Sequence, residues 1–152
     1  MFNKLLPPII DNTYRGYKVA LWIFGLVVGV MIVQSVVVIF NGYYTIMNAD
    51  GIPVDTYTPA AAQTVVALFA LRALSRLIIA LLCVIVLVRY RSAIPFMFSL
   101  LLLSYLAGQL ILQFIPLVRT GTPPGPIVNL IMFGLMIIGL ALSLRSRGVA
   151  TA

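Results

Sequence analysis

The residues of this chain with the most distinctive chemistry are two arginines inside a long apolar segment. Arg72 and Arg76 are four positions apart, so they share one face if the segment is helical. An arginine near the middle of a membrane-spanning helix costs roughly 2.5–3.5 kcal/mol on insertion scales, and it usually faces the bundle interior, water or headgroups. Its planar set of donors suits carboxylate and phosphate oxygens. The pair is therefore a candidate site for a lipid phosphate, a carboxylate or a quinone oxygen.

Polar side chains in the other apolar segments fall at a similar depth. A helical rise of about 1.5 Å per residue places them, like the two arginines, about 18 to 24 Å from one edge of the membrane. We therefore expect a bundle with a polar, basic centre in one half and an apolar centre in the other. The candidate ligand-binding residues are Arg72, Arg76, Tyr105, Gln109, Gln34 and Asn129.

Two interpretations of this cluster remain open. In the structural one, the arginines reach the headgroups or bind the amides and helix-end carbonyls around them. In the functional one, positive charge is left in excess because no acidic residue of the chain lies at that depth, and it holds an anion or pairs with an acid of a partner subunit. A third arrangement leaves no free site, because Asp50 and Asp55 in the preceding loop fold down onto Arg72.

The residues that the chain lacks exclude several kinds of chemistry. It contains no histidine and no glutamate, and its acids are Asp11, Asp50 and Asp55, all outside the apolar segments. A histidine-bound haem and a Ser-His-Asp triad are excluded, and a zinc or di-iron site is not expected. Proton relays in membranes usually use Asp, Glu or His, so proton-driven transport is also not expected. The single cysteine, Cys83, is interpreted as a small buried hydrophobe. We expect no enzyme activity, no cofactor and no metal.

The composition predicts that the chain lies in a membrane. Apolar types make up 62% and charged types 9% of its 152 residues, whereas a soluble domain has about 25% charged residues. Crossing the hydrocarbon takes about 20 apolar residues in a helix. We expect an all-α membrane protein with one transmembrane domain, 1–152, built as an up-down-up-down bundle of four helices. The expected spans are about 19–40, 66–88, 93–115 and 127–144.

Capping residues refine the helix boundaries. Thr58 is a good N-cap and Pro59 fits the first helical position, so the second helix should begin before its span and project from the membrane. Ser92 is expected to cap the third helix. The run 123–126, Pro-Pro-Gly-Pro, is expected to form a turn that cannot be helical.

The distribution of basic residues predicts the orientation. Three precede the first span, two separate the second from the third, and two follow the fourth, whereas Arg119 alone lies on the other side. The positive-inside rule then places both chain ends in the cytoplasm. We expect a multi-pass protein of the cell membrane, in a bacterium the inner membrane. The net charge of +7 belongs to these segment ends, so nucleic acid is not an expected partner.

Three pairs of small residues at a spacing of four would let helices approach closely: Gly25 with Gly29, Ser104 with Gly108, and Gly139 with Ser143. We expect packing inside the monomer.

Two functions follow from these observations. The first is a scaffold or accessory subunit that associates through helix packing with a larger membrane complex or with a second copy. The alternative is a binding or transport protein for an anionic or amphiphilic ligand at the arginine cluster, with a dimer needed for transport. Membrane lipids are expected partners in either case.

Overall fold

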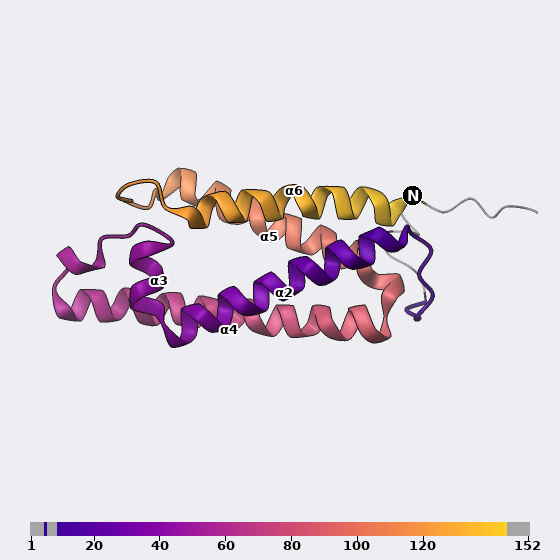
Figure 1. Ribbon diagram of the computed structural model, residues 1–152, viewed down its shortest axis with the longest axis horizontal. Helices are drawn as coiled ribbons and strands as arrows, with labels where there is room; N and C mark the ends of the chain where they lie inside the picture. Colours follow the sequence, from indigo (N-terminus) through magenta and orange to yellow (C-terminus); the bar gives the residue numbers. More distant parts are fainter. Residues whose placement is uncertain (1–4, 6–8, 146–152) are drawn as a thin grey trace, which may run out of the picture.

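The computed structural model of the protein describes Leu5 and residues 9–145. This part of the chain contains four long α-helices, one short α-helix and two three-residue 3-10 helices, which are labelled η (Figure 1). The four long helices are long and apolar enough to cross a membrane, which indicates a multi-pass membrane protein. The elements are α2 (Lys18–Phe40), α3 (Gly42–Asn48), η1 (Val54–Thr56), α4 (Pro59–Arg89), η2 (Arg91–Ala93), α5 (Ile94–Phe114) and α6 (Pro124–Leu144).

The four long helices form a bundle in which α2 is central. Helix α2 packs against α4 along one side and against α6 on another, and α5 packs mainly against α6. Helices α4 and α5 are joined by η2 and then diverge, so that their far ends lie apart (Figure 1). Helices α2 and α4 form one pair and α5 and α6 another, and the extensive contact of α2 with α6 joins the two pairs.

The two ends of the bundle differ in character. Helix α2 begins and α6 finishes at the same end, where the backbone N–H of Tyr17 donates to the carbonyl of Leu142 over 3.3 Å. We call this the basic end, because the described basic residues there are Arg15, Lys18, Arg89, Arg91 and Arg145. The opposite end carries α3, η1 and the segment 115–123, and we call it the loop end (Figure 1).

The boundaries of α4 agree with the sequence. The helix begins at Pro59, and the hydroxyl of Thr58 accepts a hydrogen bond from the N–H of Ala61 over 3.4 Å, as expected for an N-cap. Its 31 residues correspond to about 46 Å, well beyond the hydrocarbon thickness of about 30 Å. The first turns of α4 consequently project at the loop end.

Two local predictions about helix starts were wrong. Helix α6 begins at Pro124, inside the run expected to be a turn, because prolines are tolerated where a helix has no N–H bonds to lose. Ser92 does not cap α5; its hydroxyl instead donates to the carbonyl of Asp11 over 2.9 Å and accepts from the N–H of Asp11 over 2.9 Å. The loop after α2 contains the short helix α3.

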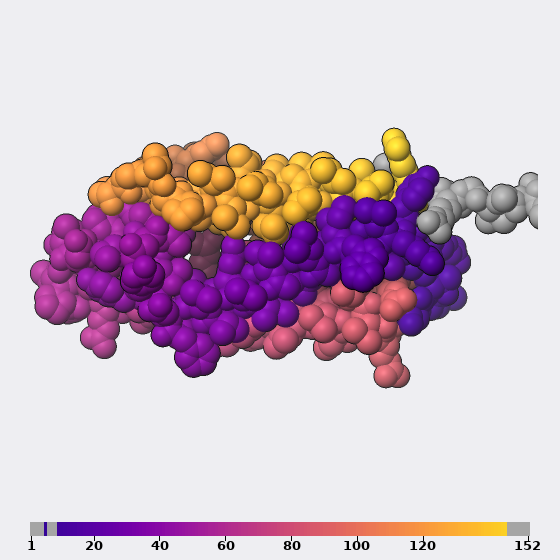
Figure 2. Space-filling model, viewed as in Figure 1, coloured from indigo at the N-terminus to yellow at the C-terminus, as the bar shows by residue number. Residues whose placement is uncertain are grey.

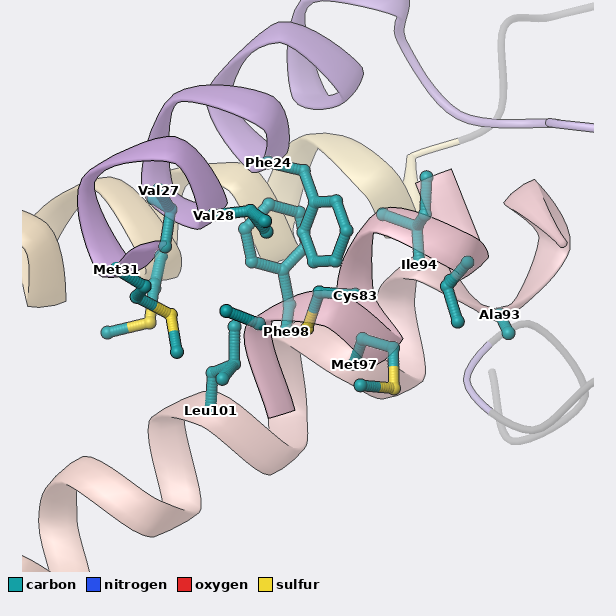
Figure 3. Close-up of a cluster of buried hydrophobic side chains, with 13 residues drawn as sticks. Phe24, Val27, Val28, Met31, Cys83, Ala93, Ile94, Met97, Phe98 and Leu101 are labelled. Atoms are coloured by element: carbon teal, nitrogen blue, oxygen red, sulfur yellow. The ribbon is translucent and has the colours of Figure 1, made fainter. Parts of the chain in front are cut away.

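The main core lies in the half of the bundle next to the basic end. Phe24 of α2 and Phe98 of α5 are fully buried and meet edge to face, with ring centroids 5.0 Å apart (Figure 3). Cys83 of α4 lies beside them and is fully buried, as predicted. The last buried residues toward the loop end are Leu101 on α5 and Met136 on α6. The apolar core that joins the two helix pairs therefore stops near the middle of the bundle.

A second, smaller core lies at the loop end. Ile46 of α3, Ile52 and Val54 are buried together, and Tyr57 and Val66 pack against them. This cluster holds α3 and η1 against the projecting turns of α4. The segment between the two cores contains most of the polar residues singled out by the sequence.

Candidate functional site

Arg76 lies on the face of α4 that packs into the bundle. Ala73, Ala80 and Cys83 are buried, and with Arg76 they make a stripe at spacings of three and four residues. Arg76 is half-buried, whereas Arg72, one position from this stripe, is exposed. The structure thus separates the two arginines into an inward and an outward residue, although they are neighbours on the helix.

The register between α2 and α4 places Gln34 at the level of Arg76. A Cβ on Gly25 would lie 3.6 Å from Leu87, and a Cβ on Gly42 would lie 3.1 Å from Val66. Gln34 and Arg76 are each about midway between these two contact points on their own helix. One partly buried polar side chain from each helix of this pair therefore occurs at the same level.

Two side-chain oxygens of α2 at this level have no partner among the described residues. The Oε1 of Gln34 and the Oγ of Ser35 are buried, and neither takes part in a hydrogen bond there. Ser35 is 1% exposed, so its hydroxyl lies inside the protein. Unpaired polar atoms at such depth cost free energy, so this level is a point of unsatisfied hydrogen-bonding capacity.

The other helix pair has a polar level of its own. Tyr105 of α5 stacks on Phe133 of α6 with ring centroids 4.7 Å apart. One turn further toward the loop end, four residues along each helix, are Gln109 on α5 and Asn129 on α6. Asn129 is half-buried and Gln109 is exposed. The register therefore brings these two amides to the same level on neighbouring helices.

A hollow separates the two helix pairs in the half next to the loop end. Figure 2 shows it between α2, α3 and α6, with α5 visible behind it. Its position agrees with the end of the apolar core at Leu101 and Met136. The polar level of Gln34 and Arg76 and that of Gln109 and Asn129 lie on the helix halves that border this hollow. None of the six candidate residues is joined to another by a hydrogen bond within the described ranges.

The loop end closes the hollow through contacts between two loops. The N–H of Thr120 donates to the carbonyl of Gly51 over 2.7 Å, and the N–H of Gly125 donates to the carbonyl of Ala49 over 2.8 Å. Gly125 must be a glycine here, because a Cβ would lie 2.6 Å from that carbonyl oxygen. These bonds tie the loop after α3 to the first turn of α6, so the two helix pairs are joined again beyond the hollow.

Asp50 lies under this closure and faces positive charge. Burial raises the pKa of its carboxyl above the ordinary value, while Arg119, Arg72 and Arg76 act in the opposite direction. Nevertheless, across the described part of the chain no carboxylate comes within 4.0 Å of an arginine or lysine nitrogen. Asp50 thus approaches the arginines, as one sequence interpretation allowed, without forming an ion pair with them.

Sequence reasoning did not identify Ser35 and Arg119 as neighbours of the polar level, and it offered Asp50 only as one of the alternatives. Ser35 gave no signal, because a serine in an apolar helix is usually a small packing residue. Asp50 and Arg119 are in different loops, and only the pairing of the two loops brings them together. Asp55, the other loop acid, forms no ion pair with Arg72 and lines a separate groove at the loop end.

No protein-family model matches the chain, and no curated protein or solved structure is significantly similar to it.

Proposed function

We propose that this protein of the cell membrane, with both chain ends cytoplasmic, binds an anionic amphiphile in the hollow between its two helix pairs. The observation that carries the proposal is the position of Arg76. This guanidinium is half-buried on the inward face of α4, and it makes no ion pair or hydrogen bond with any residue of the described segments. A buried charge without a partner is strongly unfavourable, so an external anion is the natural partner.

The chemistry around Arg76 fits the headgroup region of an anionic lipid or a fatty carboxylate. Gln34 adds an amide at the same level, and the exposed residues of α4 and α5 beside the hollow are mostly apolar, with Arg72, Gln109 and Gln113 among the exceptions. A phosphate or carboxylate would bind the guanidinium fork, while its alkyl chain stays beside the outer surfaces of α4 and α5. Positive-inside topology puts this level in the outer half of the bilayer.

Native mass spectrometry of the protein released from intact membranes tests this function. The wild type should retain an anionic lipid or fatty acid, and Arg76→Leu should lose it. Arg76→Lys keeps the charge but lacks the planar fork, so it should retain less ligand while melting near the wild-type temperature. Arg89→Gln, in the last turn of the same helix, removes a charge outside the hollow and should retain the ligand fully. Equal ligand content in all four proteins would overturn the proposal.

The orientation has its own test. Reporter fusions placed after Arg91 and at the C-terminus should read cytoplasmic, and fusions near Asp50 and Thr122 should read external. A C-terminal fusion that reads external would require an odd number of spans and would remove the basis for this topology.

A second function, an accessory subunit, is favoured by the surface of α5. Gln109 and Gln113 are both exposed on the half of α5 that leaves α4, and amides at membrane depth gain from a hydrogen-bonding partner. Ser104 is exposed, and Gly108 has no atom within 4 Å of a Cβ placed on it, so the expected internal packing of this small pair is wrong. The empty space is available to a helix of another subunit.

Cross-linking distinguishes the accessory function from ligand binding. A cysteine at Gly108, introduced with Cys83→Ala, should capture a stoichiometric protein partner or a second copy if α5 is an interface. Capture by the same substitution at Gly134 of α6, also without a neighbour within 4 Å, would show that the reaction is not specific to α5.

A further inference from the structure

A groove at the loop end, separate from the hollow, has the composition of a site for an organic cation. It has a volume of about 540 Å³ and lies between α3, η1 and the first turns of α4. Its lining combines two tyrosines, one carboxylate and one amide with an apolar floor. The lining residues are Tyr43, Val54, Asp55, Tyr57, Pro59, Ala62, Gln63 and Val66.

The charge in this groove is negative although the chain is basic. Asp55 is the only charged residue in the lining, and it pairs with no cation in the part of the chain that the structure describes. The nearest arginine along α4 is Arg72, nine residues or about 13 Å from Gln63. A cation in the groove would therefore meet one uncompensated carboxylate.

The two tyrosines supply the second element of cation recognition. Tyr57 is half-buried against the smaller core of Ile46, Ile52 and Val54, so its ring is held in place. Tyr43 is 47% exposed on α3 and borders the same groove. Aromatic faces attract ammonium groups, and alkylated ammonium ions gain most because they are poorly hydrated and fit an apolar floor.

The position of the groove decides which cations reach it. It lies on the projecting turns of α4, beyond the roughly 20 residues that the hydrocarbon can contain. Water and lipid headgroups therefore both have access to it. The N-terminus of α4, which favours anions, is occupied by its own cap, since Thr58 accepts from Ala61 N through its hydroxyl and from Ala62 N through its carbonyl.

From these observations we infer that the groove of Tyr43, Asp55, Tyr57 and Gln63 binds an alkylammonium group. The group can belong to a free small amine or to the choline headgroup of a neighbouring lipid. The inference is independent of the anion proposed for the hollow, because no lining residue is shared.

The test compares choline with 3,3-dimethylbutan-1-ol, which has the same shape and no charge, by calorimetric titration of the protein in a maltoside detergent. Choline should bind at least about fivefold more tightly than the neutral alcohol. Asp55→Asn and Tyr57→Leu should each weaken choline binding by about fivefold or more. Asp50→Asn and Tyr44→Leu, on the same end but outside the lining, should leave it unchanged. Asp55 is exposed, so its substitution tests recognition without disturbing the fold.

Nanodiscs then distinguish the two sources of the cation. If added choline binds in phosphatidylglycerol discs and not in phosphatidylcholine discs, the headgroup of phosphatidylcholine competes for the groove, and the lipid is the source of the cation. If choline binds equally in both, the ligand is a free amine. Equal affinity for choline and the neutral alcohol, or unchanged binding by Asp55→Asn, would overturn the inference.

Discussion

Gly139 of α6 lies directly against the aromatic ring of Phe98 of α5. A Cβ added to Gly139 would stand 2.7 Å from Cε1 of that ring, closer than real side chains pack. Phe98 in turn meets Phe24 of α2 edge to face. Phe98 is therefore one of the contacts that join α5 and α6 to α2, and the packing of the main core at this point depends on the absence of a side chain at position 139.

Gly139→Ala should consequently destabilise the protein. The added methyl group forces the ring of Phe98 to move, and overpacking of a core typically costs about 1–3 kcal/mol. Gly134→Ala is the matched control, because position 134 is on the same helix and has no atom within 4 Å of its Cβ. Thermal melting in one detergent should show a clear fall for Gly139→Ala and little change or a rise for Gly134→Ala. Equal melting temperatures would contradict the close packing of α5 on α6.

The sequence predicted the elements of this protein better than their arrangement. Apolar segments of membrane-spanning length and the cap at Thr58 located the four long helices, because both signals are local. The spacing of Gly139 and Ser143 predicted internal packing, and the contact with Phe98 agrees with it. The identical spacing of Ser104 and Gly108 predicted the same and was wrong, since spacing does not tell which face a neighbour covers.

The candidate site illustrates the same limit. Depth along each helix follows from counting residues, and Gln34 and Arg76 do occur at one level. Which residues then face inward depends on how far each helix is rotated about its axis, and here Arg76 turns inward and Arg72 outward. The divergence of the two helix pairs, which creates the hollow, is set by the sizes of core residues on four helices and could not be derived from any one segment.

The closure between the two loops can be tested at its glycines. Gly51 has φ +71°, and a Cβ there would also lie 2.9 Å from both Pro123 and the carbonyl oxygen of Thr120. Gly121 has a similar φ of +68° but no atom near its Cβ position. Both alanine variants bear the strain of the left-handed conformation, about 1–2 kcal/mol, and only Gly51→Ala also pushes the loops apart.

Gly51→Ala should therefore lower the melting temperature more than Gly121→Ala does. It should also make the segment 115–123 more accessible to a protease added outside right-side-out vesicles. The Gly121→Ala variant should be cleaved at the same rate as the wild type. Identical cleavage of the two variants would show that the loops are not joined at Gly51.

Cys83 reports on whether water reaches the core. The residue is fully buried beside Phe98, in the half of the bundle next to the basic end (Figure 3). It should resist a membrane-impermeant maleimide in intact membranes and react only after denaturation. A cysteine at the exposed Thr64, introduced with Cys83→Ala, should react quickly from outside. Rapid labelling of Cys83 in intact membranes would reveal a water-filled path and would favour transport over binding.

Two aspartates at opposite ends of the molecule should shift stability with pH in opposite directions. Burial raises the pKa of Asp50 above its ordinary 3.8, against the influence of Arg119. The folded state therefore holds the proton of Asp50 more tightly than the unfolded chain does. The resulting stabilisation of the fold is fully present below pH 3.8 and is lost as the pH rises through the folded-state pKa. The pKa of Asp11 is lowered from 3.8, chiefly by the hydrogen bond from the backbone N–H of Thr13. The stabilisation of the fold by the Asp11 carboxylate is therefore present above pH 3.8 and is lost as the pH falls through the lower, folded-state pKa.

Asp50→Asn should accordingly raise the melting temperature at pH 7, where it replaces a buried carboxylate with a neutral amide, and the gain should vanish toward pH 3. Asp11→Asn should lower the melting temperature at pH 7, because the amide accepts the hydrogen bond from Thr13 more weakly than the carboxylate, and its effect should also fade in acid. Melting curves of both variants and the wild type between pH 3 and 7 in one nonionic detergent give the comparison. A loss of stability for Asp50→Asn at pH 7 would mean that the attraction of Arg119, Arg72 and Arg76 for the carboxylate outweighs the cost of burying its charge. Asp50 would then stabilise the loop as an anchor.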